Sequence, residues 1–448
     1  MASTNLSKTP SSAGNRRKFN FSFWIKGNDF VSDYIFFSAS GSTESAILFD
    51  SSSRLEYYEY NGSSKTTQVT TKKVFRDAGA WYHCVISIDT TQATSSDRVK
   101  FYVNGSQETE LEHTTYGSQD FDSLFNNTTT QYIGSNASGG HFDGSMTHIH
   151  FNDGYTYDAS SFGETDSTSG IWKPKTGPSV TYGSNGYFLK FENSGAMGTD
   201  SSGNSNTYTV SGSMTQNVDT PNNNFNTLSP VVGANSGVTS SNGNRSFASG
   251  SSVNYGLMAP SFALNKGKWY FEYKMGHPCA AGFIADTYQI AERVRQKQAV
   301  GHTSEEYAWE GNGYMKTNGG QTAYGSSASA NDIIGMYVDL DNNKLYIGVN
   351  GTIQNSGTGF SITDPDSLTS GFYYIGGMSD QCGATANVTA DMNFGDGFFG
   401  TTAVSSAQAD ANGEGAFEYS PNDSGGSSFD GAAKNFYALN TKNIKEFG

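Results

Sequence analysis

Two carboxylates four residues apart, Glu306 and Glu310, form the most suggestive pair for acid–base chemistry in this chain of 448 residues. Cleavage of a glycosidic bond needs two carboxyl groups roughly 5–9.5 Å apart, one of which donates a proton. In a strand that rises about 3.3 Å per residue, positions i and i+4 lie about 13 Å apart. The sequence also lacks a Gly-x-Ser-x-Gly elbow and a Walker loop. We therefore predict that the protein is not an enzyme.

Two short patterns offer metal ligands. Asp339 and Asp341 supply oxygen atoms at alternate positions, as calcium loops do, but Lys344 stands where such a loop needs Gly and no Glu closes the pattern. An Asx-rich turn is therefore favoured, and no cofactor is predicted, with calcium as the weaker alternative. His148 and His150 would place two imidazoles on one face of a strand. Because no third ligand is evident, we expect an exposed strand face, although three copies on a symmetry axis would bring six imidazoles together.

Aromatic side chains form the candidate binding surface. Tyr307, Trp309 and Tyr314 lie in a segment rich in Gly and Asn, which predicts a flexible loop at one end of a β-sandwich. Tyr and Trp often anchor binding interfaces, so this loop is predicted to hold ligand-contact residues. The competing interpretation is that these rings pack against the chain itself. The neighbouring stretch 291–297 is the most helix-like in the chain, but it is short, so a loop excursion or a single helical turn is expected.

The charge balance is acidic, with 42 Asp and Glu residues against 27 Lys and Arg residues and a formal net charge of −15. An acidic surface repels phosphate backbones, so nucleic acid is not an expected partner. The N-terminus has no apolar h-region and no apolar run reaches about 18 residues, so neither a signal peptide nor membrane insertion is expected. The three cysteines, Cys84, Cys279 and Cys382, are scattered and predict neither a disulfide framework nor a metal site. Cys84 is expected to be a small apolar residue of a core strand.

Two stretches of the chain follow one plan, in which an apolar strand ends in Asp and a second apolar strand ends in Asn-Gly. The first runs over 81–89 and 99–105, and the second over 333–339 and 344–351. Asn-Gly between apolar alternations predicts a tight hairpin, because both residues tolerate positive φ. Strict alternation over 19–26 predicts a further strand that is buried on one face.

These elements predict an all-β fold of two tandem antiparallel β-sandwiches with little helix. Aromatic residues make up 14% of the chain, which is too many for a disordered protein. The expected organisation is an N-terminal tether 1–18, a first sandwich 19–195, a linker 196–245, a second sandwich 246–400 and a C-terminal docking segment 401–448.

The order of the motifs in the first half resembles the concanavalin A-like, or laminin G-like, jelly roll, in the form found in tailed-phage virion proteins. The residues that carry this resemblance are 11–17, 19–26, 79–89, 99–105, 133–135 and 142–144. The second half resembles a SPRY domain in residues 267–275, 332–351 and 393–395. The closing residues 435–448 are similar to the ends of SPRY-containing proteins of marine phages.

The resemblance implies a structural protein of a bacteriophage virion, assembled in the host cytoplasm. A tail fibre or adhesin that binds host-surface glycan or protein is the leading expectation. A capsid decoration or capsid appendage protein without a receptor role is the alternative. Phage appendages are commonly trimers, so the expected partners are other virion proteins and two further copies of the chain in a homotrimer. The basic residues Arg16, Arg17 and Lys18 would then make the electrostatic contact between the tether and the particle.

A glycan-degrading enzyme is the least favoured class that the resemblance allows. Hydrolases with a concanavalin-like fold carry an acidic residue midway between their two carboxylates, and here that position is Ala308. The pair Glu306 and Glu310 also falls in the SPRY-like half rather than in the jelly-roll half. SPRY domains bind protein partners through loops at one end of the sandwich, and this agrees with a contact surface around Trp309.

Overall fold

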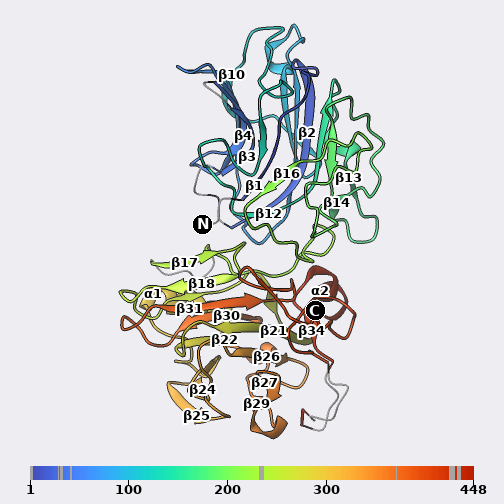
Figure 1. Cartoon of the computed structure of the whole chain (residues 1–448). Helices are drawn as coiled ribbons and strands as arrows, with labels where there is room; N and C mark the ends of the chain where they lie inside the picture. Colours follow the sequence, from blue (N-terminus) through green and yellow to red (C-terminus); the bar gives the residue numbers. More distant parts are fainter. Residues whose placement is uncertain are drawn as a thin grey trace. The chain divides into compact units, whose positions relative to one another are not determined.

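Alternating apolar and polar residues build two β-sandwiches in the computed structural model of the chain (Figure 1). The structure describes residues 4–28, 30, 34–40, 43–231, 237–369, 371–422, 429–430 and 435–448. Strands account for 43% of the chain and helices for 7%, which confirms the predicted all-β fold of antiparallel sandwiches. The chain divides into two compact units, Met1–Arg76 with Ala80–Gln216 and Asp77–Gly79 with Asn217–Gly448.

The first unit consists of an eight-stranded and a six-stranded antiparallel sheet. The eight strands lie in the order β10 (Leu111–Thr115), β6 (Lys65–Val74), β5 (Arg54–Tyr60), β4 (Glu44–Phe49), β3 (Tyr34–Ser40), β11 (Gln131–Ile133), β1 (Asn5–Lys8) and β16 (Thr209–Ser211). The six strands lie in the order β15 (Tyr187–Leu189), β12 (Gly144–Asp153), β2 (Lys18–Gly27), β7 (Tyr82–Asp89), β8 (Val99–Val103) and β9 (Ser106–Glu108). Phenylalanine rings join the two sheets, since the ring centroid of Phe21 in β2 lies 4.7 Å from that of Phe37 in β3.

The second unit has a nine-stranded and a seven-stranded sheet. The larger sheet has the order β17 (Val238–Ser241), β18 (Ser246–Ser249), β31 (Val388–Asn393), β21 (Lys268–Met275), β26 (Ile333–Asp339), β27 (Lys344–Val349) and β28 (Thr352–Ile353), with β29 (Phe360–Ser361) beside β27 and β34 (Tyr437–Ala438) beside β21. The smaller sheet has the order β19 (Leu257–Met258), β30 (Tyr374–Asp380), β22 (Ala280–Asp286), β23 (Glu306–Glu310), β24 (Tyr314–Thr317) and β25 (Gly320–Ala323), with β20 (Ala263–Leu264) beside β30. Trp269 of the larger sheet and Trp309 of the smaller one belong to the same buried cluster.

Short elements complete the two units. The first unit contains the two-stranded sheet β13 (Gly163–Thr165) and β14 (Trp172–Pro174), and the second contains β32 (Phe398–Phe399) and β33 (Thr402–Ala403). The 3₁₀-helices are η1 (Ser95–Asp97), η2 (Ala159–Ser161), η3 (Asn355–Gly357) and η4 (Pro365–Ser367).

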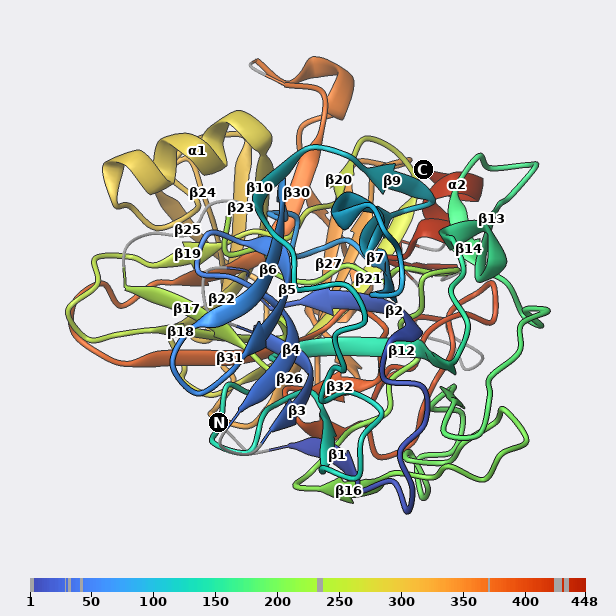
Figure 2. The ribbon, with the colours of Figure 1, turned by 90° about the horizontal axis from the view of Figure 1, so that it is seen from above.

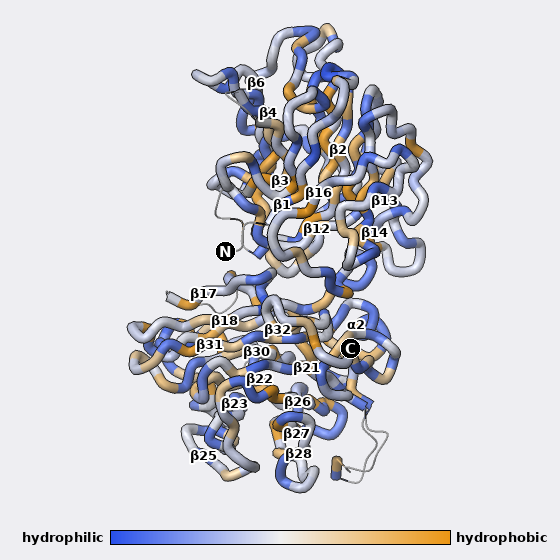
Figure 3. Tube along the Cα trace, viewed as in Figure 1, coloured by the Kyte–Doolittle hydropathy of each residue, from blue (hydrophilic) through white to orange (hydrophobic). Residues whose placement is uncertain are grey.

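Strand β2 has the predicted alternation but not the predicted exposure. Hydrophobic and hydrophilic residues alternate along it (Figure 3), and Phe21 faces the core as expected. On its other face Asn20, Ser22 and Trp24 are also buried, so the expectation of a half-buried strand is wrong. The reason is long-range packing, because Trp172 of β14 lies over this face and donates from Nε1 to a ring nitrogen of the neighbouring strand at 3.0 Å.

The two predicted Asn-Gly hairpins are confirmed and share one set of hydrogen bonds. Asn104 and Asn350 each have a φ of 46°, and each is followed by a glycine with positive φ. The backbone N–H of Asn104 donates to the carbonyl of His83, and the His83 N–H donates to Asn104 Oδ1. Asn350 and Ile333 exchange the same two hydrogen bonds in the second unit. Each asparagine side chain therefore takes the place of one more residue in the strand ladder.

The repeat extends to a third strand in each unit. Lys18, the first residue of β2, pairs in register with Asp89, and its Nζ lies 3.6 Å from Asp89 Oδ2. Lys268, the first residue of β21, pairs in the same way with Asp339 at 3.1 Å. In each unit, the Asp that ends the first strand of the repeat thus pairs with a lysine at the start of the neighbouring strand.

Two α-helices occur in the described residues, both in the second unit. Helix α1 (Thr287–Gln296) and helix α2 (Thr441–Phe447) lie on opposite sides of the unit (Figure 1, Figure 2). The expectation of a loop or single turn at 291–297 is wrong, because Asp286 caps α1 by accepting from the N–H of Tyr288 and Ile290 is buried. Over the described part of the chain, no helix is long and apolar enough to cross a membrane.

The segments outside the predicted sandwiches also contribute strands. In the expected tether 1–18, β1 pairs with both β11 and β16. In the expected linker 196–245, β16 belongs to the first unit, and β17 belongs to the second. Near the C-terminus, β34 pairs with β21, and Phe436 and Leu439 are buried.

Candidate functional site

An open pocket of about 230 Å³ lies on the face of the six-stranded sheet that points away from the phenylalanine core. Alternate residues of a strand point to one face, so β7 and β8 supply its floor. The segment that follows β12 and the turn between β7 and β8 supply its walls. The lining residues are Ser87, Asp89, Gln92, Asp97, Lys100, Tyr102, Thr156, Tyr157 and Asp158.

Hydrogen bonds hold the wall of this pocket against its floor. The hydroxyl of Ser87 lies 2.7 Å from Asn20 Oδ1 and 2.6 Å from the carbonyl oxygen of Tyr157. The hydroxyl of Tyr157 accepts from the N–H of Thr181 at 2.9 Å. Tyr157 is therefore held both at its backbone carbonyl and at its side-chain hydroxyl, so one wall of the pocket is preformed.

The carboxylate of Asp89 is kept ionised. Burial raises its pKa, but hydrogen bonds from Thr91 and Gln92 and the charge of Lys18 outweigh burial and leave the pKa below its ordinary value. Gln92 Nε2 donates to Asp89 Oδ2 at 2.8 Å. Thr91 donates to Oδ1, and Gln92 and Lys18 are the partners of Oδ2, so the Asp89 carboxylate holds the edge of the pocket in place and is a poor proton donor.

The pocket as a whole is acidic and has two aromatic side chains. Three of its side chains are carboxylates and one is an ammonium group, Lys100, which lies 3.1 Å from Asp97 Oδ1. Burial raises the pKa of Tyr102, so its hydroxyl stays protonated at neutral pH. Carboxylate acceptors, a phenol donor and two tyrosine rings suit a neutral ligand that carries many hydroxyl groups.

The predicted carboxylate pair is part of the fold of the second unit. Glu306 and Glu310 both belong to β23, an interior strand of the seven-stranded sheet. Arg293 Nε lies 3.0 Å from Glu306 Oε1, at an angle that makes an ion pair but not a hydrogen bond. The N–H groups of Gly301 and His302 donate to Glu306 Oε2 at 2.7 and 2.8 Å. The Glu306 carboxylate thus already has partners on both oxygens.

The aromatic segment that is predicted to be a loop forms a strand, so that prediction is wrong. Tyr307 and Trp309 lie in β23, and their side chains are 4% and 0% exposed. Tyr314, the first residue of β24, is 39% exposed. Neighbouring strands cover both edges of β23 and the opposite sheet covers its inner face. Alternating aromatics two residues apart are also the pattern of a core strand, and this was the signal that the Gly and Asn content obscured.

The candidate calcium ligands are used within a turn. Asp339 accepts from the backbone N–H and the side-chain amide of Asn342 at 3.0 and 2.9 Å. Asp341 Oδ1 accepts from the N–H of Gly267 at 2.8 Å. Asp339 thus organises an Asx-rich turn, the favoured interpretation, and Asp341 ties this turn to the residue that precedes β21.

The expectation that His148 and His150 lie on an exposed strand face is wrong. A register shift interrupts β12 between Thr147 and His150, where His148 has a φ of 47°. His150 is 2% exposed and stacks on Phe188 with ring centroids 3.9 Å apart. A chelate of adjacent imidazoles on a flat strand is therefore not formed.

Instead, burial keeps three histidines of the first unit neutral, namely His83, His148 and His150. Trp172 Nε1 donates to His83 Nδ1 at 3.0 Å, so the proton of that ring is on Nε2, which lies 2.9 Å from Ser22 Oγ. Burial lowers the pKa of His83 to about 3 and that of His148 to about 4. Burial also places the pKa of His150 well below its ordinary value.

We expect the first unit to lose stability as the pH falls from 6.5 to 4. The unfolded chain takes up protons on these histidines in that range and the folded chain does not. Glu59 opposes this trend, because burial raises its pKa from 4.5 to about 7 and the folded chain then holds the extra proton. Urea unfolding of Glu59→Gln should therefore show a steeper acid loss than the parent, and a flat profile in this variant would contradict the assignment.

The basic residues of the N-terminal segment are engaged within the first unit. Arg16 Nε donates to the carbonyl of Ser123 at 2.6 Å, and Arg17 Nε donates to Asp122 Oδ1 at 2.8 Å. Lys18 makes the ion pair with Asp89 described above. Their contact with a virus particle stays a prediction. To make it, these side chains would have to leave their present partners in the first unit.

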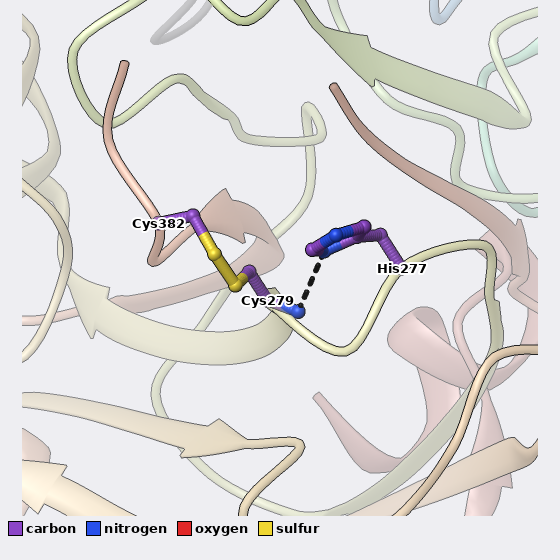
Figure 4. Close-up of side chains that lie close together, drawn as sticks. All are labelled: His277, Cys279 and Cys382. Carbon is purple, nitrogen blue, oxygen red and sulfur yellow. Dashed lines mark hydrogen bonds between the residues drawn. A yellow bond between two sulfur atoms is a disulfide. The ribbon is translucent and has the colours of Figure 1, made fainter. Parts of the chain in front are cut away.

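The expectation that the cysteines form no disulfide is wrong. Cys279 and Cys382 form a disulfide with a Cα–Cα distance of 5.5 Å, across a sequence separation of 103 (Figure 4). Spacing could not show this, because the two residues meet only when β22 and β30 pair. Cys84 is a buried core residue, as predicted, and burial raises the pKa of its thiol.

Comparisons with known proteins found similarity to parts of the chain. A family model described as the concanavalin A-like lectin/glucanases superfamily matches residues 2–155. Among solved structures, the SPRY domain of human HERC1 is 14% identical over 33% of this chain and 87% of that chain, with a TM-score of 0.26. The PSpry domain of TRIM65 is 10% identical over 38% and 91%, with a TM-score of 0.28. Stonustoxin is 15% identical with a TM-score of 0.29, and the match covers 38% of this chain and 27% of the stonustoxin chain.

Proposed function

We propose that the chain is a structural protein of a tailed-phage virion, mounted as a tail fibre or adhesin, and that its first unit binds a neutral glycan on the host surface. The observation that carries the binding proposal is the open polar pocket of about 230 Å³ on a concanavalin A-like unit. The virion setting, with other virion proteins as partners and a homotrimer as the assembly, rests on the resemblance of the motif order to tailed-phage proteins.

The pocket favours binding over glycan hydrolysis. A glycosidase needs one carboxylic acid with a raised pKa that protonates the leaving group. The pKa of Asp89 is lowered instead, so this carboxylate cannot supply that proton. The excess of carboxylates also disfavours sulfated or carboxylated glycans through like-charge repulsion.

Replacing Tyr102 by alanine should weaken glycan binding by about 10-fold or more, because a stacking ring contributes on the order of 1–2 kcal/mol to a contact. Calorimetric titration with a panel of neutral and acidic oligosaccharides measures this. Tyr60→Ala is the matched control, since Tyr60 is 37% exposed on β5 of the other sheet of the same unit. Equal loss in both variants, or preference for acidic oligosaccharides, would remove the pocket from the proposal.

Particle experiments separate the adhesin from a capsid protein without a receptor role. Immunogold labelling should mark the tail, and the purified chain should compete with phage adsorption while Tyr102→Ala does not. Labelling over the capsid together with unchanged adsorption would favour capsid decoration. Release of reducing ends from host polysaccharide would favour an enzyme.

A further inference from the structure

Three metal-binding side chains meet at one end of the seven-stranded sheet. Ligand atoms of His277, Cys279 and Cys382 all lie within 4.8 Å of one another (Figure 4). In the part of the chain that the structure describes, they are the only such group of three histidine, cysteine or acidic residues. All three side chains are partly exposed, so solutes can reach them.

The backbone holds the two cysteines together independently of their sulfur–sulfur bond. Strands β22 and β30 pair over seven residue positions, and Ala280 pairs with Asp380 at the end that carries the cysteines. The N–H of Gln381 donates to the carbonyl of Cys279 at 3.0 Å, and the N–H of Cys382 donates to Asp380 Oδ1 at 2.7 Å. When the disulfide is reduced, the two thiols therefore stay adjacent.

A ring nitrogen of His277 lies beside the two cysteine sulfurs. His277 Nδ1 accepts a hydrogen bond from the N–H of Cys279 at 3.1 Å, so Nδ1 carries a lone pair, and it can bind a cation once it gives up this hydrogen bond. Two thiolates and one imidazole are three of the four ligands of a tetrahedral zinc site, and water can supply the fourth.

We propose that His277, Cys279 and Cys382 form an exchangeable cross-link, which is a disulfide under oxidising conditions and a site for a zinc-type divalent cation under reducing conditions. Reduction by a cellular thiol such as glutathione transfers two electrons: the disulfide and two thiols give two cysteine thiols and one oxidised glutathione. The two cysteine thiols then bind the cation as thiolates and release two protons. Either linkage ties the segment before β22 to the segment after β30.

Cobalt binding to the full chain tests the proposal. The background is Cys84→Ala, which removes the third, buried thiol. After anaerobic reduction with a phosphine, one equivalent of Co²⁺ should give thiolate-to-cobalt charge-transfer and tetrahedral d–d absorption bands. Zn²⁺ should bleach these bands, and the oxidised chain should show none. Absence of the bands from the reduced chain would overturn the proposal.

A histidine variant distinguishes a three-ligand site from a simple pair of thiols. His277→Ala should form the disulfide as readily as the background but bind Co²⁺ at least about 10-fold more weakly, because losing a ligand costs no less than losing a supporting contact. His302→Ala is the control, as an exposed histidine of the same unit. Unchanged Co²⁺ affinity in His277→Ala would exclude the histidine and contradict the proposed site.

Circular dichroism keeps the result interpretable if reduction weakens the fold. A reduced chain that is unfolded without metal but folded with one equivalent of Zn²⁺ supports the cross-link. A reduced chain that stays unfolded with Zn²⁺ contradicts it.

Discussion

Replacing Trp309 by alanine is expected to lower the free energy of unfolding of the second unit by about 3–5 kcal/mol, the usual cost of deleting a fully buried Trp side chain. Trp309 is 0% exposed, and its strand neighbours in register are Gly282 and Met315. Gly282 has no side chain with which to fill the space that the indole leaves. Urea unfolding followed by circular dichroism measures the change as a shift of one transition.

Tyr314→Ala provides the comparison, because Tyr314 is 39% exposed on the adjacent strand and should cost less than about 1 kcal/mol. Glycan binding and phage adsorption should be unchanged in folded Trp309→Ala, since the ring is not on the surface. Lost adsorption with unaltered unfolding would reinstate Trp309 as a contact residue and would contradict its burial.

Removing one partner of the buried ion pair Arg293–Glu306 should lower the free energy of unfolding by a similar amount. Arg293 is 6% and Glu306 0% exposed, so Arg293→Met leaves an uncompensated carboxylate in the core and is expected to cost about 3–5 kcal/mol. The pair joins α1 to β23, so α1 should fray at the same time. The free energy of unfolding and the helical signal near the α1 segment by hydrogen exchange measure the two effects.

A double-mutant cycle checks that the loss comes from the charge. Arg293→Met with Glu306→Gln should recover part of the stability lost in Arg293→Met alone, because the core then holds no unpaired charge. The matched control is Arg295→Met, whose solvent-screened pair with Glu292 on the same helix should contribute far less than the buried pair. Strictly additive single and double variants would show that the two side chains are not coupled.

Local sequence pattern was sufficient for the elements of this protein. Alternation with a period of two identified β2, β7 and β21, because each strand residue faces one of two sides of a sheet. Asn104 and Asn350 identified their hairpins, since the turn geometry depends only on the residues within it. The repeat of Asp and Asn-Gly therefore led to two tandem sandwiches without any knowledge of long-range contacts.

The site could not be predicted in the same way. Alternation shows that a strand has two faces, but not what covers each of them. Trp309 was placed on a loop because Gly and Asn follow it, yet β22 and β24 enclose its strand. The outer face of β2 was expected in solvent, yet the segment with Trp172 covers it.

Only the tertiary structure brought distant residues together. The polar pocket combines β7 and β8 with Tyr157 and its neighbours, which come from a segment more than fifty residues further along the chain. Cys279 and Cys382 are separated by 103 residues and meet because β22 pairs with β30. The sequence by itself determined the strands and turns, since these depend on neighbours along the chain. The pocket, the disulfide and the burial of Trp309 depend on strand pairing and sheet packing, which are contacts between residues that are remote in sequence.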